Sequence, residues 1–270
     1  MRLRASAAAV TGAMAITALA APTAQAEENP RYASPRAAFA AGAQSDGDIK
    51  ISSVSVNAGK PLVVGATAAK KVTVTFTISD ASGVDSADAE LWHGSSFRNP
   101  DAMIISDKSA TCGKGVKVVC KQTFTVDPEW DIYNDDAGAW KVSVIAFGTD
   151  FDLLLEDNVK SFAIQRLSKL TVNATPEPVK KGKTLTVTGA LTRANWDYGT
   201  YSGYTAQPVK LQFRKKNAKA YTTVKTVKTD SKGKLRTTVK ASADGYYRYS
   251  FAGTATTPAV NATGDGIDVR

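Results

Sequence analysis

The stretch VTVTFTIS, residues 72–79, decides the fold class of this 270-residue chain. Its apolar and polar residues alternate, so an extended strand places the apolar side chains on one face. The alternation recurs in LTVTGAL (185–191), VKLQFR (209–214), LRTTVK (235–240) and TFTVD (123–127), and no helical period is found after residue 26. The sequence therefore predicts an all-β protein. The first two stretches supply these inward-facing residues: Val72, Val74, Phe76, Ile78, Leu185, Val187, Gly189 and Leu191.

A second comparison indicates an internal duplication. AGAWKVSV (137–144) and DGYYRYSF (244–251) align when Gly138 is matched to Gly245, and Trp140 then matches Tyr247. In each stretch a glycine turn enters a strand whose first inward residue is a large aromatic. Short strands separated by regularly spaced turn signals are typical of immunoglobulin-like (Ig-like) sandwiches. We therefore expect two tandem, divergent Ig-like β-sandwich domains.

The beginning of the chain predicts export. Arg2 and Arg4 precede an uncharged, alanine-rich run, and an A-x-A site ends at Ala26, which is the pattern of a cleaved secretory signal. A membrane anchor is the alternative, but the run is shorter and less hydrophobic than the ~20 apolar residues a span needs. We expect a secreted, extracellular protein with the signal peptide cleaved after Ala26 and no membrane span thereafter. The expected parts are a signal peptide (1–26), a flexible leader (27–46) and two sandwiches (47–165 and 166–270).

Charge differs sharply between the two predicted sandwiches. Residues 27–165 contain 13 Lys and Arg against 19 Asp and Glu, a net charge of −6. Residues 166–270 contain 19 against 6, a net charge of +13. Such an asymmetry predicts different neighbours for the two surfaces and carries no information about the fold.

Two cysteines, Cys112 and Cys120, lie close together in TCGKGVKVVC. In an exported chain such a pair predicts a disulfide that closes a small loop. Zinc is the alternative, but it would need further ligands, and the chain has one histidine.

Several stretches resemble the Ig-like modules of secreted actinobacterial proteins, in particular those of Streptomyces. The resemblance is carried by NATPEPVKKGKTLTVTGALTRANWD, PVKLQFRKK and ADGYYRYSFAGTATTPAV, and it covers residues 167–270. Over residues 47–165 it is looser and depends on DASGV, the cysteine pair and AGAWKV. The resemblance implies an extracellular spacer or binding domain, and it supplies no catalytic residues.

Catalytic equipment is not evident in the sequence. No phosphate-binding loop or zinc-protease motif occurs, and His93, at a predicted strand end, is expected to face solvent. We predict a protein that is not an enzyme and has no cofactor, although counting carboxylates leaves a glycosidase-like pair open. Hard oxygen ligands in the first domain make Asp80, Asp85 and Asp88 candidates for calcium, with ordinary solvated turn residues as the alternative.

The stretch NWDYGTYSGY (195–204) places four aromatic residues in what we predict to be a loop between the second and third strands of the basic domain. They could stack against sugar rings or an anionic polymer, or they could fold inward and cap the core. We favour the cap, with Trp196 buried. The four candidates are Trp196, Tyr198, Tyr201 and Tyr204.

Strand alternation also predicts a basic face on the second domain. If the apolar residues of VKLQFR face the core, Lys210 and Arg214 face outward, and the same argument turns Arg248 outward. These strands are expected to be neighbours in one sheet. Either Lys225 or Lys228, on the adjoining strand, is expected to join the same face.

The leading functional hypothesis is an exported, non-catalytic protein that binds or spaces cell-envelope components. The basic domain would bind anionic wall polymers, and no specific nucleic acid is expected as a partner. The alternatives are an accessory or inhibitor protein with an extracellular protein partner, and a carbohydrate-binding module that uses residues 195–204. Basic surfaces bind polyanions by releasing counterions, so we expect the second domain, but not the first, to be retained on anionic wall material at low salt.

Overall fold

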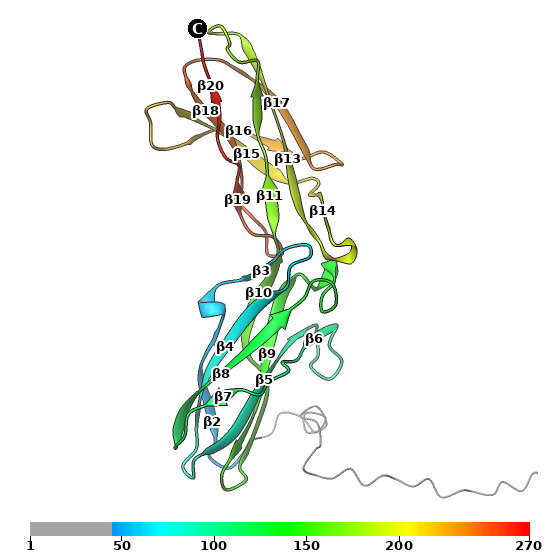
Figure 1. Ribbon diagram of the computed structural model, residues 1–270, viewed down its shortest axis with the longest axis vertical. Helices are drawn as coiled ribbons and strands as arrows, with labels where there is room; N and C mark the ends of the chain where they lie inside the picture. The colour runs from blue at the N-terminus through cyan, green and yellow to red at the C-terminus, as the bar shows by residue number, and fades with distance from the viewer. Residues whose placement is uncertain (1–44) are drawn as a thin grey trace, which may run out of the picture. The chain divides into compact units, whose positions relative to one another are not determined.

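The computed structural model describes residues 45–270 (Figure 1). The predicted signal peptide, its cleavage after Ala26 and nearly all of the predicted leader lie outside these residues. Strand β1 (Ser45–Asp46) pairs with β10, so the first sheet begins two residues inside the segment predicted to be a leader. Within the described part of the chain no helix is long and apolar enough to cross a membrane.

The fold is all-β, as predicted, and the strands up to Arg166 form two sheets. The first sheet has the order β1, β10 (Leu153–Arg166), β9 (Gly138–Gly148), β5 (Val84–His93) and β6 (Ala102–Ile104), with β3 (Leu62–Val64) parallel to β10. The second has the order β2 (Lys50–Val56), β4 (Lys70–Ser79), β8 (Lys117–Val126) and β7 (Thr111–Cys112).

The core of the first sandwich lies between these sheets. Every apolar residue predicted from VTVTFTIS is at most 1% exposed, so the orientation of β4 is confirmed. These side chains belong to the same cluster as Trp140, Val142 and Val144 of β9. Trp140 is fully buried, and its indole Nε1 donates a hydrogen bond of 2.7 Å to the backbone oxygen of Asp136. Its polar atom is therefore satisfied inside the core.

The strands from Ser168 onward form a second sandwich. One sheet contains β11 (Ser168–Leu170), β12 (Asn173–Thr175), β13 (Thr184–Asn195), β14 (Thr200–Gly203) and β17 (Lys234–Lys240). The other contains β16 (Thr222–Lys228), β15 (Pro208–Lys215), β18 (Gly245–Phe251), β19 (Val260–Asn261) and β20 (Asp265–Ile267). Three 3₁₀ turns also lie within residues 45–270: η2 (Asn57–Gly59), η3 (Asn134–Asp136) and η4 (Trp196–Tyr198).

The two sandwiches repeat one topology. The pairing of β4 with β8 corresponds to that of β13 with β17, and β9, between β5 and β10, corresponds to β18, between β15 and β19. Gly138 begins β9 with a φ of 136°, and Gly245 begins β18. The aligned aromatics Trp140 and Tyr247 are 0% and 3% exposed, so both face inward as predicted.

A glycine in the inward row of β13 makes room for an aromatic from the opposite sheet. A Cβ on Gly189 would lie 2.9 Å from the ring of Tyr249 and would collide with the backbone oxygen of Thr171. The Tyr249 hydroxyl donates a hydrogen bond of 3.0 Å to the backbone oxygen of Val187. The small residue in LTVTGAL therefore admits a fully buried tyrosine that bridges the two sheets.

The predicted disulfide is present. Cys112 of β7 and Cys120 of β8 are bonded and directly opposite one another in the strand register. Cys120 is fully buried within the first core.

The connection between the sandwiches is very short. Leu167 alone separates the end of β10 from the start of β11. Its backbone N–H donates to the oxygen of Val64, and its own oxygen accepts from Ala194, both at 2.8 Å. Arg166 Nε donates to the Ala194 oxygen at 2.6 Å, and burial together with the charge of Arg193 lowers the pKa of Arg166 to about 10.

Candidate functional site

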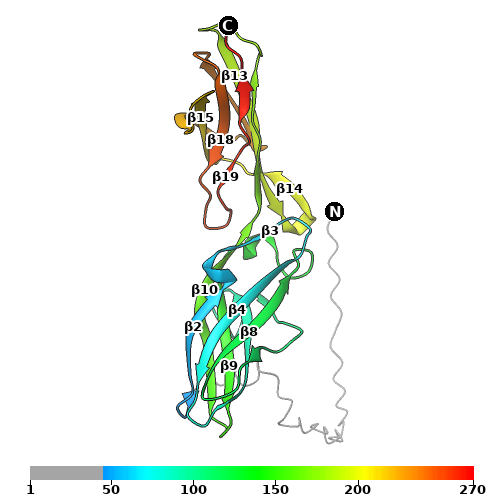
Figure 2. The ribbon, with the colours of Figure 1, turned by 60° about the vertical axis from the view of Figure 1, so that its left-hand side comes forward.

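The predicted basic face lies on the outer side of the sheet in which β15 pairs with both β16 and β18, and Figure 2 shows β15 beside β18. β15 pairs with β18, as expected, and the register sets Gln212 opposite Arg248 and Arg214 opposite Tyr246. Val209, Leu211, Tyr247 and Tyr249 of the same strands are buried. Because side chains alternate along a strand, Lys210, Arg214 and Arg248 point to the opposite, outer side.

Aromatic rings hold both arginines of this face. The guanidinium of Arg214 lies 4.4 Å from the ring centre of Tyr246 and 5.3 Å from that of Tyr221. The guanidinium of Arg248 lies 3.9 Å from the Tyr221 ring, and its Nε donates to Gln212 Oε1 at 2.8 Å. Both guanidinium groups are therefore close enough to the Tyr221 ring for a cation–π interaction. We call Lys210, Arg214, Tyr221, Tyr246 and Arg248 the arginine–tyrosine face.

Acidic partners do not neutralise this face. Among residues 45–270, the close contacts between a basic side-chain nitrogen and a carboxylate oxygen are those of His93 with Asp101 and Asp136, and of Arg270 with Asp268. No carboxylate of the described residues therefore lies within 4.0 Å of the charged groups of Lys210, Arg214 or Arg248. The arrangement leaves concentrated positive charge beside half-buried aromatic rings.

The adjoining strand adds one lysine to the face. Lys228 is exposed and lies opposite Pro208, on the same side of the sheet as Lys210. Lys225 instead reaches β17 of the other sheet, where its Nζ donates to the backbone oxygen of Thr238 at 2.9 Å. Lys225 and Lys228 lie in one continuous register and are three positions apart, so their side chains point to opposite faces of the sheet.

The aromatic stretch 195–204 is not the open loop that we expected. β13 extends to Asn195, η4 follows, and β14 turns back to pair with β13. The sequence did not predict this hairpin, because turn-forming residues recur along the stretch and its second strand, β14, is only four residues long.

The four aromatics of this stretch do not gather on one surface. Trp196 is 3% exposed and belongs to the core of the first sandwich rather than its own. Tyr201 packs against that same core with Lys169 Nζ 3.6 Å from its ring, whereas Tyr204 packs against the second core with Arg193 at 4.0 Å. Tyr198 is 78% exposed. The structure therefore favours the buried alternative for Trp196. The four aromatic residues do not form a single stacking platform.

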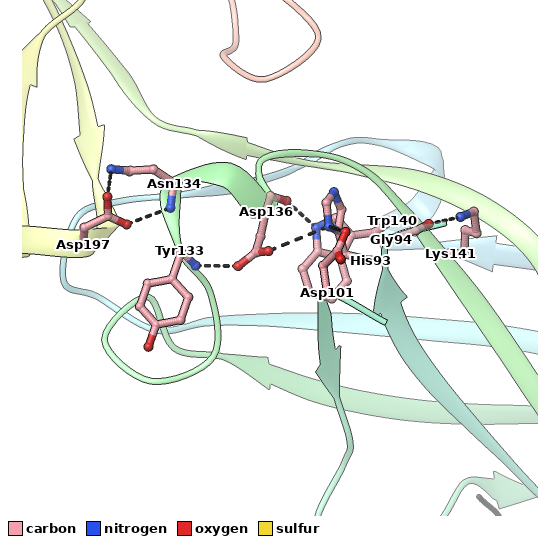
Figure 3. Close-up of polar contacts among 9 residues, drawn as sticks. All are labelled: His93, Gly94, Asp101, Tyr133, Asn134, Asp136, Trp140, Lys141 and Asp197. Carbon is pink, nitrogen blue, oxygen red and sulfur yellow. Dashed lines mark hydrogen bonds and ion pairs between the residues drawn. The ribbon is translucent and has the colours of Figure 1, made fainter. Parts of the chain in front are cut away.

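Asn134 of η3 binds this hairpin (Figure 3). Its side chain donates to Asp197 and to Asn195 Oδ1, and its Oδ1 accepts from the Trp196 N–H at 3.0 Å. Its backbone N–H also donates to Asp197 Oδ1 at 2.9 Å. One asparagine therefore holds three consecutive residues of the turn.

His93 was predicted to face solvent, and this prediction is wrong, because the side chain is only 19% exposed. Figure 3 shows it between Asp101 and Asp136, with Nδ1 3.7 Å from a carboxylate oxygen of each. Asp136 also accepts from the Tyr133 N–H at 2.6 Å, and the His93 ring packs on Trp140. These contacts give His93 a structural environment at the end of β5.

The predicted calcium candidates, Asp80, Asp85 and Asp88, do not come together in the structure. Asp88 Oδ1 accepts hydrogen bonds from Ala110 N–H and Gln122 Nε2, and Asp85 is exposed and accepts from Ser86. Asp80 instead lies beside two aspartates that sequence reasoning missed, Asp48 and Asp152. Spacing along the chain could not reveal this group, because its members come from three separate segments.

Comparison with solved structures gave similarities too weak to support an argument about fold or function. No protein-family model matches the chain, and no curated protein does. The ectodomain of the teleost fish polymeric Ig receptor is 13% identical, with a TM-score of 0.27 over 80% of this chain and 98% of that chain. The D00–D0 domain of Intimin is 16% identical, with a TM-score of 0.27 over 80% and 99%. Yersinia pseudotuberculosis adhesin InvE is 14% identical, with a TM-score of 0.28 over 82% and 60%. Scores of this size support no conclusion about function.

Proposed function

We propose that this chain is an exported, non-catalytic protein that binds or spaces components of the cell envelope. Its second sandwich would bind anionic wall polymers through the arginine–tyrosine face. The observation that supports this proposal is the placement of Arg214 and Arg248 against the Tyr221 ring, with no carboxylate of the described residues within 4.0 Å of either guanidinium.

The chemistry of the face suits a chain of phosphate groups. Guanidinium groups form paired hydrogen bonds to phosphate oxygens, and stacking on an aromatic ring reduces the side-chain entropy that binding would otherwise cost. Each arginine keeps N–H donors at its edge while its plane contacts a ring. Lys210 and Lys228, both exposed, extend the positive charge along the sheet. Such a surface binds repeating anions with an affinity that falls as salt rises.

The alternatives have less support. A carbohydrate-binding module would use the aromatics of residues 195–204, but these side chains contact two different cores or stand alone. An accessory protein with an extracellular protein partner needs an exposed apolar patch. The large exposed apolar side chains of the described residues are, for the most part, in the first sandwich, so such a partner would bind there.

The test is retention of the full chain on purified, phosphate-containing wall polymer. We expect retention at ~50 mM salt and elution well below 1 M, because screening shortens the range of these interactions. Tyr221→Leu removes the ring between the arginines without altering charge, and it should weaken binding several-fold. Tyr198→Leu, at an exposed tyrosine outside the face, should bind like the parent. A parent that is not retained at ~50 mM salt would refute the proposal.

A further inference from the structure

Three aspartates from distant segments meet at one end of the first sandwich. Asp48 precedes β2, Asp80 follows β4, and Asp152 lies in the turn between β9 and β10. Each offers a carboxylate oxygen, and these oxygens lie within 4.8 Å of one another. None of the three aspartates has a Lys, Arg or His nitrogen within 4.0 Å among residues 45–270. Three carboxyl groups therefore lie close together with no basic side-chain nitrogen of the described residues within 4.0 Å.

Asp80 provides the independent evidence for a ligand. The residue is only 3% exposed, and its Oδ1 accepts hydrogen bonds from the Ser82 hydroxyl and from the N–H groups of Ser82 (2.9 Å) and Gly83 (3.1 Å). Its Oδ2 is buried and has no hydrogen-bond partner. A buried carboxylate oxygen without a partner is costly, so an unpaired one in a native fold calls for an explanation.

Two glycines show where this oxygen points. A Cβ on Gly148 would lie 2.6 Å from Asp80 Oδ2, 2.7 Å from Asp150 Oδ1 and 3.1 Å from the Asp152 Cβ. These three atoms therefore surround one point, and Asp80 Oδ2 faces the Asp152 side of the cluster. Gly47 has a φ of 83°, and a Cβ there would collide with the Asp152 carboxylate. Glycine at both positions leaves room for the carboxylates to approach the backbone.

Backbone hydrogen bonds fix the other two carboxylates. Asp152 Oδ2 accepts from the Asp48 N–H at 2.7 Å, and Asp48 Oδ1 accepts from the Ala81 N–H at 3.3 Å. Thr149 joins the two loops, because its N–H donates to the Gly83 oxygen and its hydroxyl to the Ser82 oxygen, both at 2.8 Å. The cluster is therefore held by contacts that involve no ion, which preorganises it for one.

We infer that Asp48, Asp80 and Asp152 form a calcium-binding site. Calcium takes six to eight oxygen ligands at about 2.3–2.6 Å, so two of its ligands lie at most about 5 Å apart, which the cluster satisfies. Magnesium demands a closer octahedron with ligands at about 2.0–2.1 Å, and structural zinc prefers nitrogen and sulfur. Water completes the coordination on the exposed side of Asp48. The site joins the segment before β2 to the β9–β10 turn, and it is independent of polymer binding by the second sandwich.

The test uses the full chain after treatment with a chelator and dialysis. Addition of calcium chloride should produce a titratable binding heat and raise the melting temperature, because an ion that binds only the folded state stabilises it. Magnesium chloride at the same concentration should produce a smaller shift. Absence of both heat and shift at millimolar calcium would overturn the inference, as would an equal response to magnesium.

Variants locate the site. Asp48→Asn, at an exposed residue, should fold normally and bind calcium at least tenfold more weakly than the parent. Asp152→Asn provides a second test from a different segment. Asp85→Asn is the matched control, because Asp85 is exposed in the same sandwich but lies outside the cluster, and it should respond like the parent. An undiminished response in both Asp48→Asn and Asp152→Asn would place any calcium elsewhere.

Discussion

The indole Nε1 of Trp196 donates a hydrogen bond of 2.9 Å to the backbone oxygen of Gly65, 131 residues earlier in the chain. Trp196 follows β13 of the second sandwich, yet it belongs to the core of the first. The bond satisfies the polar atom of a side chain that is 3% exposed. The hairpin of residues 195–204 is therefore a structural element of both sandwiches.

Trp196→Ala should lower the free energy of unfolding by about 3–5 kcal/mol, the usual cost of removing a large buried aromatic. Trp196→Phe keeps most of the packing but loses the hydrogen bond, which contributes about 0.5–1.5 kcal/mol. Urea unfolding followed by circular dichroism measures both. Tyr198→Ala, at an exposed neighbour, should leave the unfolding curve unchanged. A Trp196→Ala curve that overlays the parent would show that this residue does not contribute to the core.

Trp140 and Tyr247 occupy equivalent inward positions, so truncation should have similar effects in the two sandwiches. Trp140→Ala and Tyr247→Ala should each cost about 3–5 kcal/mol of unfolding free energy. Trp130→Ala is the matched control for the first, because Trp130 is 77% exposed. Thermal melting distinguishes the cases. If Trp140→Ala melts within a degree or two of the parent, the alignment of the two sandwiches is incorrect.

The disulfide closes a short loop, with a sequence separation of 8 residues. Loop-closure entropy for a ring of this size gives about 2.5 kcal/mol at most. Replacement of Cys112 and Cys120 by alanine should therefore lower the free energy of unfolding by up to that amount. Intact mass with and without reductant checks the bond in the native protein. Free thiols in that material would contradict the prediction.

Stability should fall at alkaline pH because of buried tyrosines. Burial raises the pKa of Tyr249 to about 12 and also raises the pKa of Tyr247 above its ordinary value. The unfolded chain ionises these groups near pH 10, so their contribution is complete below pH 10 and is lost as the pH rises toward 12. Tyr249 alone should account for a loss of roughly 2 kcal/mol.

Urea unfolding at several pH values between 9 and 12 measures this loss. Tyr249→Phe should be less stable at neutral pH by about 0.5–1.5 kcal/mol, the contribution of the bond to Val187, and its stability should fall less between pH 10 and 12. Tyr198→Phe controls for the exposed tyrosines. An identical alkaline decline in the parent and in Tyr249→Phe would rule out Tyr249 as its source.

The alternation of apolar and polar residues predicted those features of the fold that depend on residues close together in the chain. The inward rows of β4 and β13, the outward placement of Arg248 and the buried aromatics after Gly138 and Gly245 all follow from the two-residue period of a strand. The disulfide was predictable because its two cysteines lie only 8 positions apart in the chain. Each of these features depends on residues a few positions apart.

Contacts between distant segments were not predictable. Trp196 was expected to cap its own core, but a carbonyl at Gly65 and the side chain of Asn134 hold it against the other one. The aspartate cluster could not be predicted for the same reason, because Asp48, Asp80 and Asp152 are adjacent only after β2 has paired with β4, and β10 with β1 and β9. The spacing of residues along the chain does not show which distant segments come into contact in the folded protein.

We propose that anionic polymer binds to the arginine–tyrosine face and not merely to a surface of positive net charge. The second sandwich offers an internal control, because β17 exposes three basic residues on the opposite sheet without the paired arginines and tyrosines: Lys234, Arg236 and Lys240. Reversal of these three to glutamate changes the net charge by the same amount as reversal of Lys210, Arg214 and Arg248.

The most direct measurement is the salt concentration at which each of these two triple variants elutes from wall polymer, with circular dichroism confirming that both are folded. The Lys210, Arg214 and Arg248 variant should not be retained at ~50 mM salt, whereas the β17 variant should be retained and elute at somewhat lower salt than the parent. Equal retention or equal loss of the two variants would contradict the proposed role of the arginine–tyrosine face, because polymer binding would then depend only on the net charge.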